Sequence, residues 1–197
     1  MGMPPGRIGP DIFVRDESGA SAVWERPQSG YDPAPTTLVC GRAQAATNVT
    51  MKILVLHGPN LNLFGRREPH IYGTTTLTEI NAKLAALARE LDVELETFQS
   101  NHEGALIDKL HECIDGVDGA LLNPAGLTQH SVSLHDAIKA MPFPVLEIHM
   151  SNIAAREPWR DHSIIASAAK ATIQGLGWRS YTAGLRALVE TLREGKK

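Results

Sequence analysis

The sequence predicts an α/β fold in which helices cover both faces of a doubly wound, five-stranded parallel sheet. Three observations support this prediction. From Met51 onward, short apolar runs alternate with segments whose apolar residues recur every three or four positions. Residues rich in turn propensity, mainly Gly, Pro and Asn, separate these segments. Five strand–helix units fit between residue 51 and residue 197, and such alternation indicates parallel strands joined by crossover helices, as in flavodoxin-like folds.

The first unit shows the pattern most clearly. Residues 52–57 (KILVLH) form a short apolar run, typical of a strand that is buried on both faces. After a loop rich in Gly, Pro and Asn, Thr76 and Glu79 have the spacing of a capping box, which predicts a helix start. Apolar residues at spacings of three and four then mark the buried face of this helix: Leu77, Ile80, Leu84, Leu87 and Leu91.

The later units follow the same order. We expect a second strand over 93–98, a second capping box at Ser100 and Glu103, and a third strand over 120–122 that ends at Asn123. The apolar positions of the helix between these strands are Leu106, Ile107, Leu110 and Ile114. The remaining predicted elements are a helix over 131–141, strands over 145–149 and near 172–174, and a last helix that carries Tyr181 on its apolar face.

Residues 1–50 differ in composition, and we expect them to be a disordered extension before a folded domain at 51–197. They hold half of the twelve prolines and six of the seventeen glycines, without a sustained apolar period. Alternatively, translation starts at Met51, or the extension is a docking segment. Its aromatic anchors would then be Phe13, Trp24 and Tyr31.

Composition excludes several classes of protein. A net charge of −3 argues against a dedicated nucleic-acid-binding protein. No run of 18 apolar residues occurs, so we expect no membrane-spanning helix and no membrane partner. Two cysteines, Cys40 and Cys113, are too few for a disulfide framework or a thiolate metal site, which favours a cytoplasmic location.

Polar side chains cluster where the predicted strands end. In a parallel α/β sheet, ligands bind outside the carboxyl ends of the strands. The segments that follow the first four strands supply many Asn, Arg and His side chains and few free carboxylates. This edge would therefore suit a small, anionic and hydroxylated ligand.

Motifs for other chemistry are incomplete. Gly175 and Gly177 lack the third glycine of a dinucleotide fingerprint, and no G-x-S-x-G surrounds Ser131. His111 and Glu112 are not followed by a histidine at the spacing of a zinc protease. We therefore expect no protein-bound metal.

Five segments carry a resemblance to a known family: HGPNLNLFGRREPHIYG (57–73), QSNHEG (99–104), NPAGLT (123–128), EIHMSN (147–152) and AREPWR (155–160). In order and spacing they resemble the type II 3-dehydroquinate dehydratases over nearly all of 51–197. The resemblance implies reversible dehydration of 3-dehydroquinate to 3-dehydroshikimate without a cofactor. It also implies a homododecamer built as a tetramer of trimers.

The resemblance assigns roles to individual residues. Tyr72 matches the base that removes a proton next to the ketone. The pKa of a free tyrosine is about 10, so it must be lowered before the phenol can act as a base at neutral pH. Arg67 matches the cation that lowers it. His149 matches the acid that protonates the departing hydroxyl, and Glu147, on the same face of the strand, orients its ring. Asn60 matches the residue that steadies a water over the enolate oxygen, although Asn also suits a turn after Gly-Pro.

Four further residues match substrate contacts of the family: Asn123, Met150, Ser151 and Arg160. Asp136 matches an acidic residue that reaches the site of a neighbouring subunit. The chain departs from the family pattern at Gln129, where a histidine is usual and where His130 comes next. We favour Gln129 as the substrate contact, because the spacing around it needs no insertion; a shifted turn would use His130 instead.

Two other functions stay open at this point. One is a related binding protein that has lost catalysis, which the intact set of Arg67, Tyr72, Glu147 and His149 argues against. The other is a flavodoxin-like module that binds a flavin or receives phosphate. That module needs a phosphate-cradling loop or an acidic pocket, and the sequence shows neither.

Overall fold

The computed structural model describes residues 50–66 and 73–195. In this part of the chain, five parallel strands form one sheet in the order β2-β1-β3-β4-β5. The strands are β1 (Met51–His57), β2 (Val93–Gln99), β3 (Gly119–Asn123), β4 (Val145–His149) and β5 (Ala171–Gln174). This is the flavodoxin-like strand order, so the predicted fold class is confirmed.

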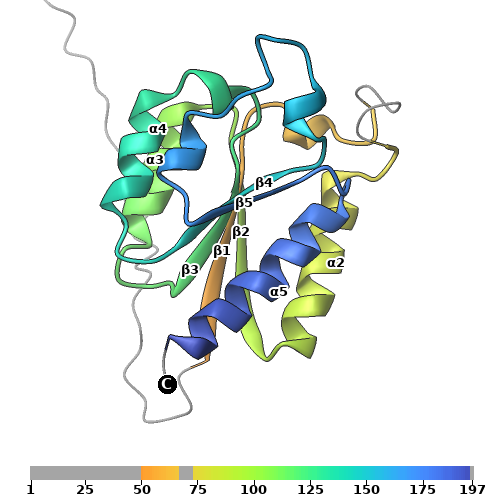
Figure 1. Ribbon diagram of the computed structural model, residues 1–197. Coiled ribbons are helices and arrows are strands. Elements are labelled where there is room, and N and C mark those ends of the chain that lie inside the picture. Colours follow the sequence, from red (N-terminus) through yellow and green to blue (C-terminus); the bar gives the residue numbers. More distant parts are fainter. Residues whose placement is uncertain (1–49, 67–72, 196–197) are drawn as a thin grey trace, which may run out of the picture. The chain divides into compact units, whose positions relative to one another are not determined.

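Helices cover both faces of the sheet (Figure 1). One face carries α2 (Leu77–Glu90) and α5 (Arg179–Glu194), and the other carries α3 (Glu103–Glu112) and α4 (Val132–Ala140). Between β4 and β5 the chain forms only two short 3₁₀ helices, η3 (Ile153–Ala155) and η4 (Ile165–Ser167). No helix within the described ranges is both long and apolar enough to span a bilayer.

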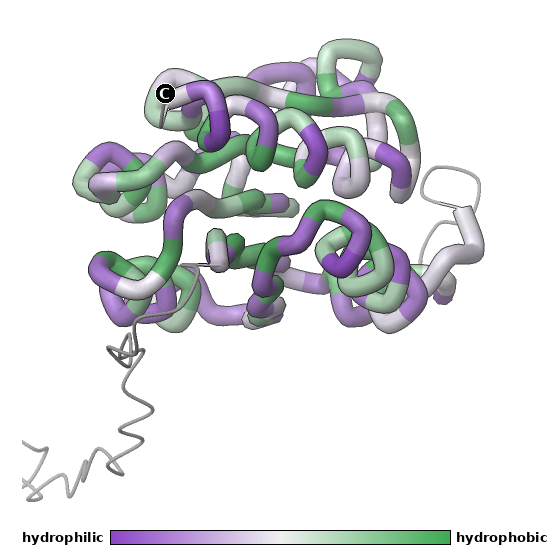
Figure 2. The backbone as a smooth tube through the Cα atoms, turned by 90° about the horizontal axis from the view of Figure 1, so that it is seen from below, coloured by the Kyte–Doolittle hydropathy of each residue, from purple (hydrophilic) through white to green (hydrophobic). Residues whose placement is uncertain are grey.

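The strand β1 explains why the described part of the chain has two hydrophobic cores. Successive side chains of a strand point to opposite faces of the sheet. Ile53 and Val55 pack in the core beneath α2 and α5, whereas Leu54 and Leu56 pack in the core beneath α3 and α4. All four side chains are fully buried, as predicted for a strand covered on both faces. Figure 2 shows the helices mixing hydrophilic and hydrophobic residues along their length, as an amphipathic covering layer requires.

The predicted capping box at Thr76 and Glu79 is confirmed. The Thr76 side chain accepts a hydrogen bond from the Glu79 backbone N–H at 3.2 Å. In return, a Glu79 carboxylate oxygen accepts the Thr76 backbone N–H at 2.7 Å. These two bonds satisfy donors that a helix start otherwise leaves unpaired, and they fix where α2 begins.

The second predicted capping box, at Ser100 and Glu103, is wrong. His102 is the N-cap of α3 and makes no side-chain capping bond. The Ser100 hydroxyl instead accepts the backbone N–H of His102 at 2.9 Å, two residues along, which closes a tight turn. The Glu103 carboxylate accepts a hydrogen bond from Ser131, the N-cap of α4, and so is not available to cap its own helix.

Candidate active site

A cavity lies at the carboxyl ends of the strands, where the sequence predicts a cluster of polar side chains. Its lining includes residues from the ends of β3 and β4 and from the loops after β1, β3 and β4. Among them are most of the site residues that the sequence predicts: Asn60, Asn123, Gln129, His149, Met150, Ser151 and Arg160. The topology thus brings together residues that are up to 100 positions apart in the chain.

The loop after β1 is held against the end of β3. The Gly58 N–H donates to the Asn123 carbonyl at 2.8 Å, and a Cβ at Gly58 would lie 2.6 Å from the Pro124 carbonyl oxygen. Only glycine allows this approach. Asn60 then takes the left-handed conformation, with φ of 65°, and its N–H donates to the Asn101 side chain at 2.8 Å. Asn60 is therefore both a turn residue and part of the cavity wall.

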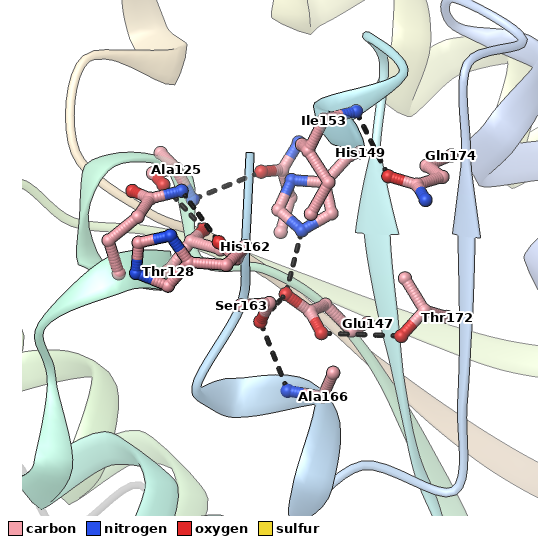
Figure 3. A network of polar contacts seen from close by, with 12 residues as sticks. Ala125, Thr128, Glu147, His149, Ile153, His162, Ser163, Ala166, Thr172 and Gln174 are labelled. Atoms are coloured by element: carbon pink, nitrogen blue, oxygen red, sulfur yellow. Dashed lines mark hydrogen bonds and ion pairs between the residues drawn. The ribbon is translucent and has the colours of Figure 1, made fainter. Parts of the chain in front are cut away.

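His149 and Glu147 form a buried pair at the end of β4 (Figure 3). The His149 Nε2 lies 2.7 Å from the Glu147 Oε1. The Ser163 hydroxyl donates to the same carboxylate oxygen at 2.7 Å, and the Thr172 hydroxyl donates to the other at 3.3 Å. Since all three partners can donate, the site is built for an ionised Glu147. Glu147 fixes Nε2 as the donor and leaves Nδ1 of His149 for a ligand.

Asn123 lines the cavity and is held by a second polar group behind it. Its Nδ2 donates to the Tyr181 hydroxyl at 3.0 Å, and its Oδ1 accepts the Ala125 N–H at 3.1 Å. The Tyr181 hydroxyl also lies 3.1 Å from Nδ1 of His57. Burial raises the pKa of Tyr181 and lowers the pKa of His57 to about 4, so both are neutral at neutral pH.

The loop after β4 supplies cationic and backbone groups. Ser151, Arg156 and Arg160 all line the cavity. In the described part of the chain, the Nε of Arg160 is the one buried side-chain nitrogen or oxygen without a hydrogen-bond partner. Its guanidinium stacks on Trp159, with 4.3 Å from Cζ to the ring centroid. A buried guanidinium N–H that lacks a protein acceptor favours an anionic or hydroxylated ligand.

Gln129 and His130 differ clearly in position. Gln129 lines the cavity, whereas His130 is exposed and does not contribute to the lining. The Gln129 amide nitrogen donates to the backbone carbonyls of Arg160 and His162, at 3.2 Å each. Gln129 thus ties the η2 turn (Ala125–Gln129) to the loop that carries Arg160, and its carbonyl oxygen is what it can still offer to a ligand.

These positions predict the kinetics of two single variants. We expect Gln129→Ala to raise KM by about five- to a hundredfold, because the Arg160 loop loses its tie and the ligand loses a polar contact. His130→Ala should stay within about twofold of the unmodified chain. Steady-state kinetics on both variants test this; the reverse order of effects would mean that His130 is the contact.

Four predicted site residues are not found in the cavity wall as the structure describes it. Glu147 is hydrogen-bonded to His149 but does not itself line the cavity. Arg67 and Tyr72 lie outside the described residues. Asp136 is on α4, its side chain is 70% exposed, and its carboxylate pairs with Nδ1 of His135 at 2.8 Å. Between residues 50–66 and 73–195, no three His, Cys, Asp or Glu side chains are grouped so that they could hold a metal ion.

Comparison with known proteins agrees with this geometry. The family described as dehydroquinase class II matches residues 51–189, well over half of the chain. The chain belongs to the class II dehydroquinases. The match begins at Met51, the first residue of β1.

Individual class II dehydroquinases and their relatives are similar over the same region. A 3-dehydroquinate dehydratase from Desulforudis audaxviator is 53% identical over 146 residues, which cover 74% of this chain and 97% of the relative. A 3-dehydroquinate dehydratase from Gloeobacter violaceus is 50% identical over 144 residues, which cover 73% of this chain and 90% of the relative. A crystal structure of a type II dehydroquinase from Propionibacterium acnes superposes with a TM-score of 0.70 at 38% identity, covering 73% of this chain and 99% of that one.

The sequence did not predict the residues that support this candidate site. Ser163 and Thr172 hold Glu147, and His57 and Tyr181 hold Asn123. Tyr181 was expected in the core, and it is fully buried, but its hydroxyl faces polar partners. The sign of this role in the sequence is the tyrosine hydroxyl on an otherwise apolar helix face, since a buried tyrosine hydroxyl usually has a hydrogen-bond partner.

Proposed function

We propose that the chain catalyses the reversible dehydration of 3-dehydroquinate to 3-dehydroshikimate, a hydro-lyase reaction of the shikimate pathway that also serves quinate catabolism. The observation that carries the proposal is the buried Glu147–His149 pair, which opens into a cavity lined by Asn123 and Arg160 in a class II dehydroquinase. The pair supplies a proton donor, and the cavity suits an anionic, hydroxylated ring.

In the first step, Tyr72 acts as the base that takes the proton next to the ketone. Arg67 lowers the pKa of the Tyr72 phenol, because a nearby cation favours the phenolate. The charge that develops on the ketone oxygen needs a hydrogen-bond donor. Asn60, in the wall of the cavity, steadies a water molecule in that place. The roles of Tyr72 and Arg67 rest on the family segment at 57–73.

In the second step, His149 protonates the tertiary hydroxyl, which leaves as water. Since Nε2 of His149 is engaged by Glu147, the proton moves through Nδ1. Glu147 stabilises the positive charge that the imidazole carries before it gives up the proton. The buried position of both side chains keeps bulk water away from the carboxylate and preserves this pairing.

Substrate binding uses the groups around this pair. Ser151 and the backbone amide of Met150 hold the substrate carboxylate, and Arg160 binds hydroxyl or anionic oxygens. The Met150 and Ser151 carbonyls accept the N–H groups of Gly177 and Gly175, at 2.9 and 3.1 Å, which fixes this stretch of backbone against the end of β5. The cavity wall is therefore positioned before a ligand binds.

The experiment that tests the function adds 3-dehydroquinate to the purified full-length chain and follows the ultraviolet absorbance of the conjugated enone. We expect the absorbance to rise, and the reverse reaction to consume added 3-dehydroshikimate. A chain that binds 3-dehydroquinate in a calorimeter without producing the enone would instead be a binding relative that has lost catalysis.

Arg67→Ala should slow the same step that Tyr72 performs. Without the cation, the Tyr72 pKa returns toward about 10, so less of the phenol is ionised at neutral pH. We expect kcat to fall at pH 7 and to recover in part as the pH approaches 10. A uniformly low rate at every pH would mean that Arg67 mainly binds the substrate.

We also propose that the chain works in the cytoplasm as a homododecamer, a tetramer of trimers, in which Asp136 reaches the site of a neighbouring subunit. Two features support this assembly. Asp136 is exposed and lies outside the cavity wall of its own chain. Val132, one turn earlier on α4, is a large hydrophobic residue that is 62% exposed. Light scattering after size-exclusion chromatography measures the mass directly.

Deleting residues 1–50 should leave turnover and assembly almost unchanged. The family match begins at Met51, and the segment before it has no periodic apolar face to dock. Kinetics and light scattering on the truncated chain check this. Loss of most of the turnover, or of the assembly, would show that the extension is structural.

A further inference from the structure

A chain of side-chain hydrogen bonds runs from helix α2 through the protein interior to the cavity. Asn81 on α2 lies 3.0 Å from Nε2 of His57, at the end of β1. Nδ1 of His57 lies 3.1 Å from the hydroxyl of Tyr181 on α5. That hydroxyl accepts Nδ2 of Asn123, at the end of β3, at 3.0 Å. His57, Tyr181 and Asn123 are buried, and only Asn123 reaches the cavity.

The hydrogen bonds of this series all have the same direction, with each donor pointing from Asn123 toward Asn81. His57 is neutral, and its Nε2–H donates to the Oδ1 of Asn81, so its Nδ1 can only accept. The Tyr181 hydroxyl therefore donates to His57 and uses its oxygen to accept from Asn123. At the far end, the Ala125 N–H occupies the Oδ1 of Asn123.

This polarity leaves a single orientation for the Asn123 amide. If the amide were turned over, its NH₂ group would face the Ala125 N–H, and its oxygen would face a Tyr181 hydroxyl whose hydrogen already goes to His57. Each mismatch would leave a buried polar group unpaired. In the observed orientation, Nδ2 donates one hydrogen to Tyr181, which leaves its second hydrogen for a ligand in the cavity that Asn123 lines.

We propose that His57 and Tyr181 are positioning residues that fix the Asn123 amide as a hydrogen-bond donor toward an oxygen of the substrate. This rests on the proposed function, in which Asn123 contacts 3-dehydroquinate. The Tyr181 ring belongs to the apolar core beneath α2 and α5, and the hydrogen bonds of its hydroxyl in the described residues are those to His57 and Asn123. The two histidines of the site then have separate tasks: His149 moves a proton, and His57 orients a donor.

A double-mutant cycle tests the proposal. Tyr181→Phe removes one oxygen and keeps the ring that fills the core. We expect it to raise KM by about five- to a hundredfold, with little change in kcat, because the hydrogen bond is made to bound substrate and transition state alike. In an Asn123→Ala background the same change should alter KM by less than about twofold, since no amide is left to position.

A second pair of variants separates the hydrogen bond from the packing. His57→Asn keeps an acceptor, because the Oδ1 of the new side chain takes the place of Nδ1, and KM should stay within about threefold. His57→Leu removes the acceptor and should behave as Tyr181→Phe does. Thr182→Val is the matched control, because the Thr182 hydroxyl on the same helix donates to the Arg179 carbonyl at 3.1 Å and takes no part in the bonds to Asn123 in the described residues. It should leave KM unchanged.

Several results would overturn the proposal. Equal KM effects of Tyr181→Phe with and without Asn123 would show that the hydroxyl acts elsewhere, and so would a lower melting temperature with unchanged KM. If Tyr181→Phe does not fold, equal kinetics of His57→Asn and His57→Leu would overturn it. An unmodified chain without turnover would instead overturn the proposed function, and calorimetric binding of 3-dehydroquinate by the same variants would then decide on the positioning role.

Discussion

Tyr72→Phe is expected to lower kcat for 3-dehydroquinate by about 10²–10⁴-fold, the range that a general base contributes. The phenol oxygen takes the proton in the first step, and phenylalanine keeps the ring without that oxygen. Because the phenol makes little contact with the ground state, the calorimetric Kd should stay within about tenfold. The enone assay measures the loss of turnover, and circular dichroism checks that the fold is kept.

The chain offers a matched control for this variant. Tyr181 is the other tyrosine in residues 51–197, and Tyr181→Phe removes the same atom from a buried position. We expect it to act on KM and to leave kcat nearly intact, in contrast to Tyr72→Phe. Near-native turnover by pure Tyr72→Phe would contradict the assignment of the base.

His149→Gln should also lower kcat by about 10²–10⁴-fold. Glutamine places an amide N–H close to where Nε2 of His149 donates to Glu147, so the buried carboxylate keeps its partners and the fold is preserved. The substituted side chain has no group that can give a proton to the departing hydroxyl. Steady-state kinetics measure kcat, and the thermal melting temperature reports on the Glu147 pairing.

His130→Gln makes the same chemical change at an exposed position next to the cavity, and it should be nearly silent. If His149→Gln instead raised KM and left kcat within about tenfold, His149 would be a binding residue and the proton would come from elsewhere.

Most of the fold could be predicted because its signals are local. The burial of Ile80, Leu84 and Leu87 follows from a period of 3.6 residues, and the start of α2 follows from Thr76 and Glu79. Ser100 has the same spacing to Glu103, yet it closes a turn instead, since Glu103 bonds to a residue of another helix. Spacing alone cannot show that a tertiary partner competes for a side chain.

The parts of the site that follow from the sheet topology could be predicted from the sequence. The ends of parallel strands meet at one edge, so His149 and Asn123 had to come together. The bonds that support them join residues far apart in sequence, such as His57 and Tyr181, which are 124 positions apart. The hydrogen bonds from Gln129 to the Arg160 and His162 carbonyls could not be predicted either, because they depend on the path of an irregular loop.

The strand order has a consequence for synthesis of the protein. β1 is the first strand of the domain to leave the ribosome, yet it lies between β2 and β3 in the finished sheet. Its second edge stays open until Asn123, the end of β3, has emerged. During that interval Ile53–Leu56, four residues that end up fully buried, form an apolar strand with unpaired backbone groups. The nascent domain therefore passes through a stage in which an apolar strand edge is exposed to aggregation, and this stage ends when β3 closes the sheet around β1.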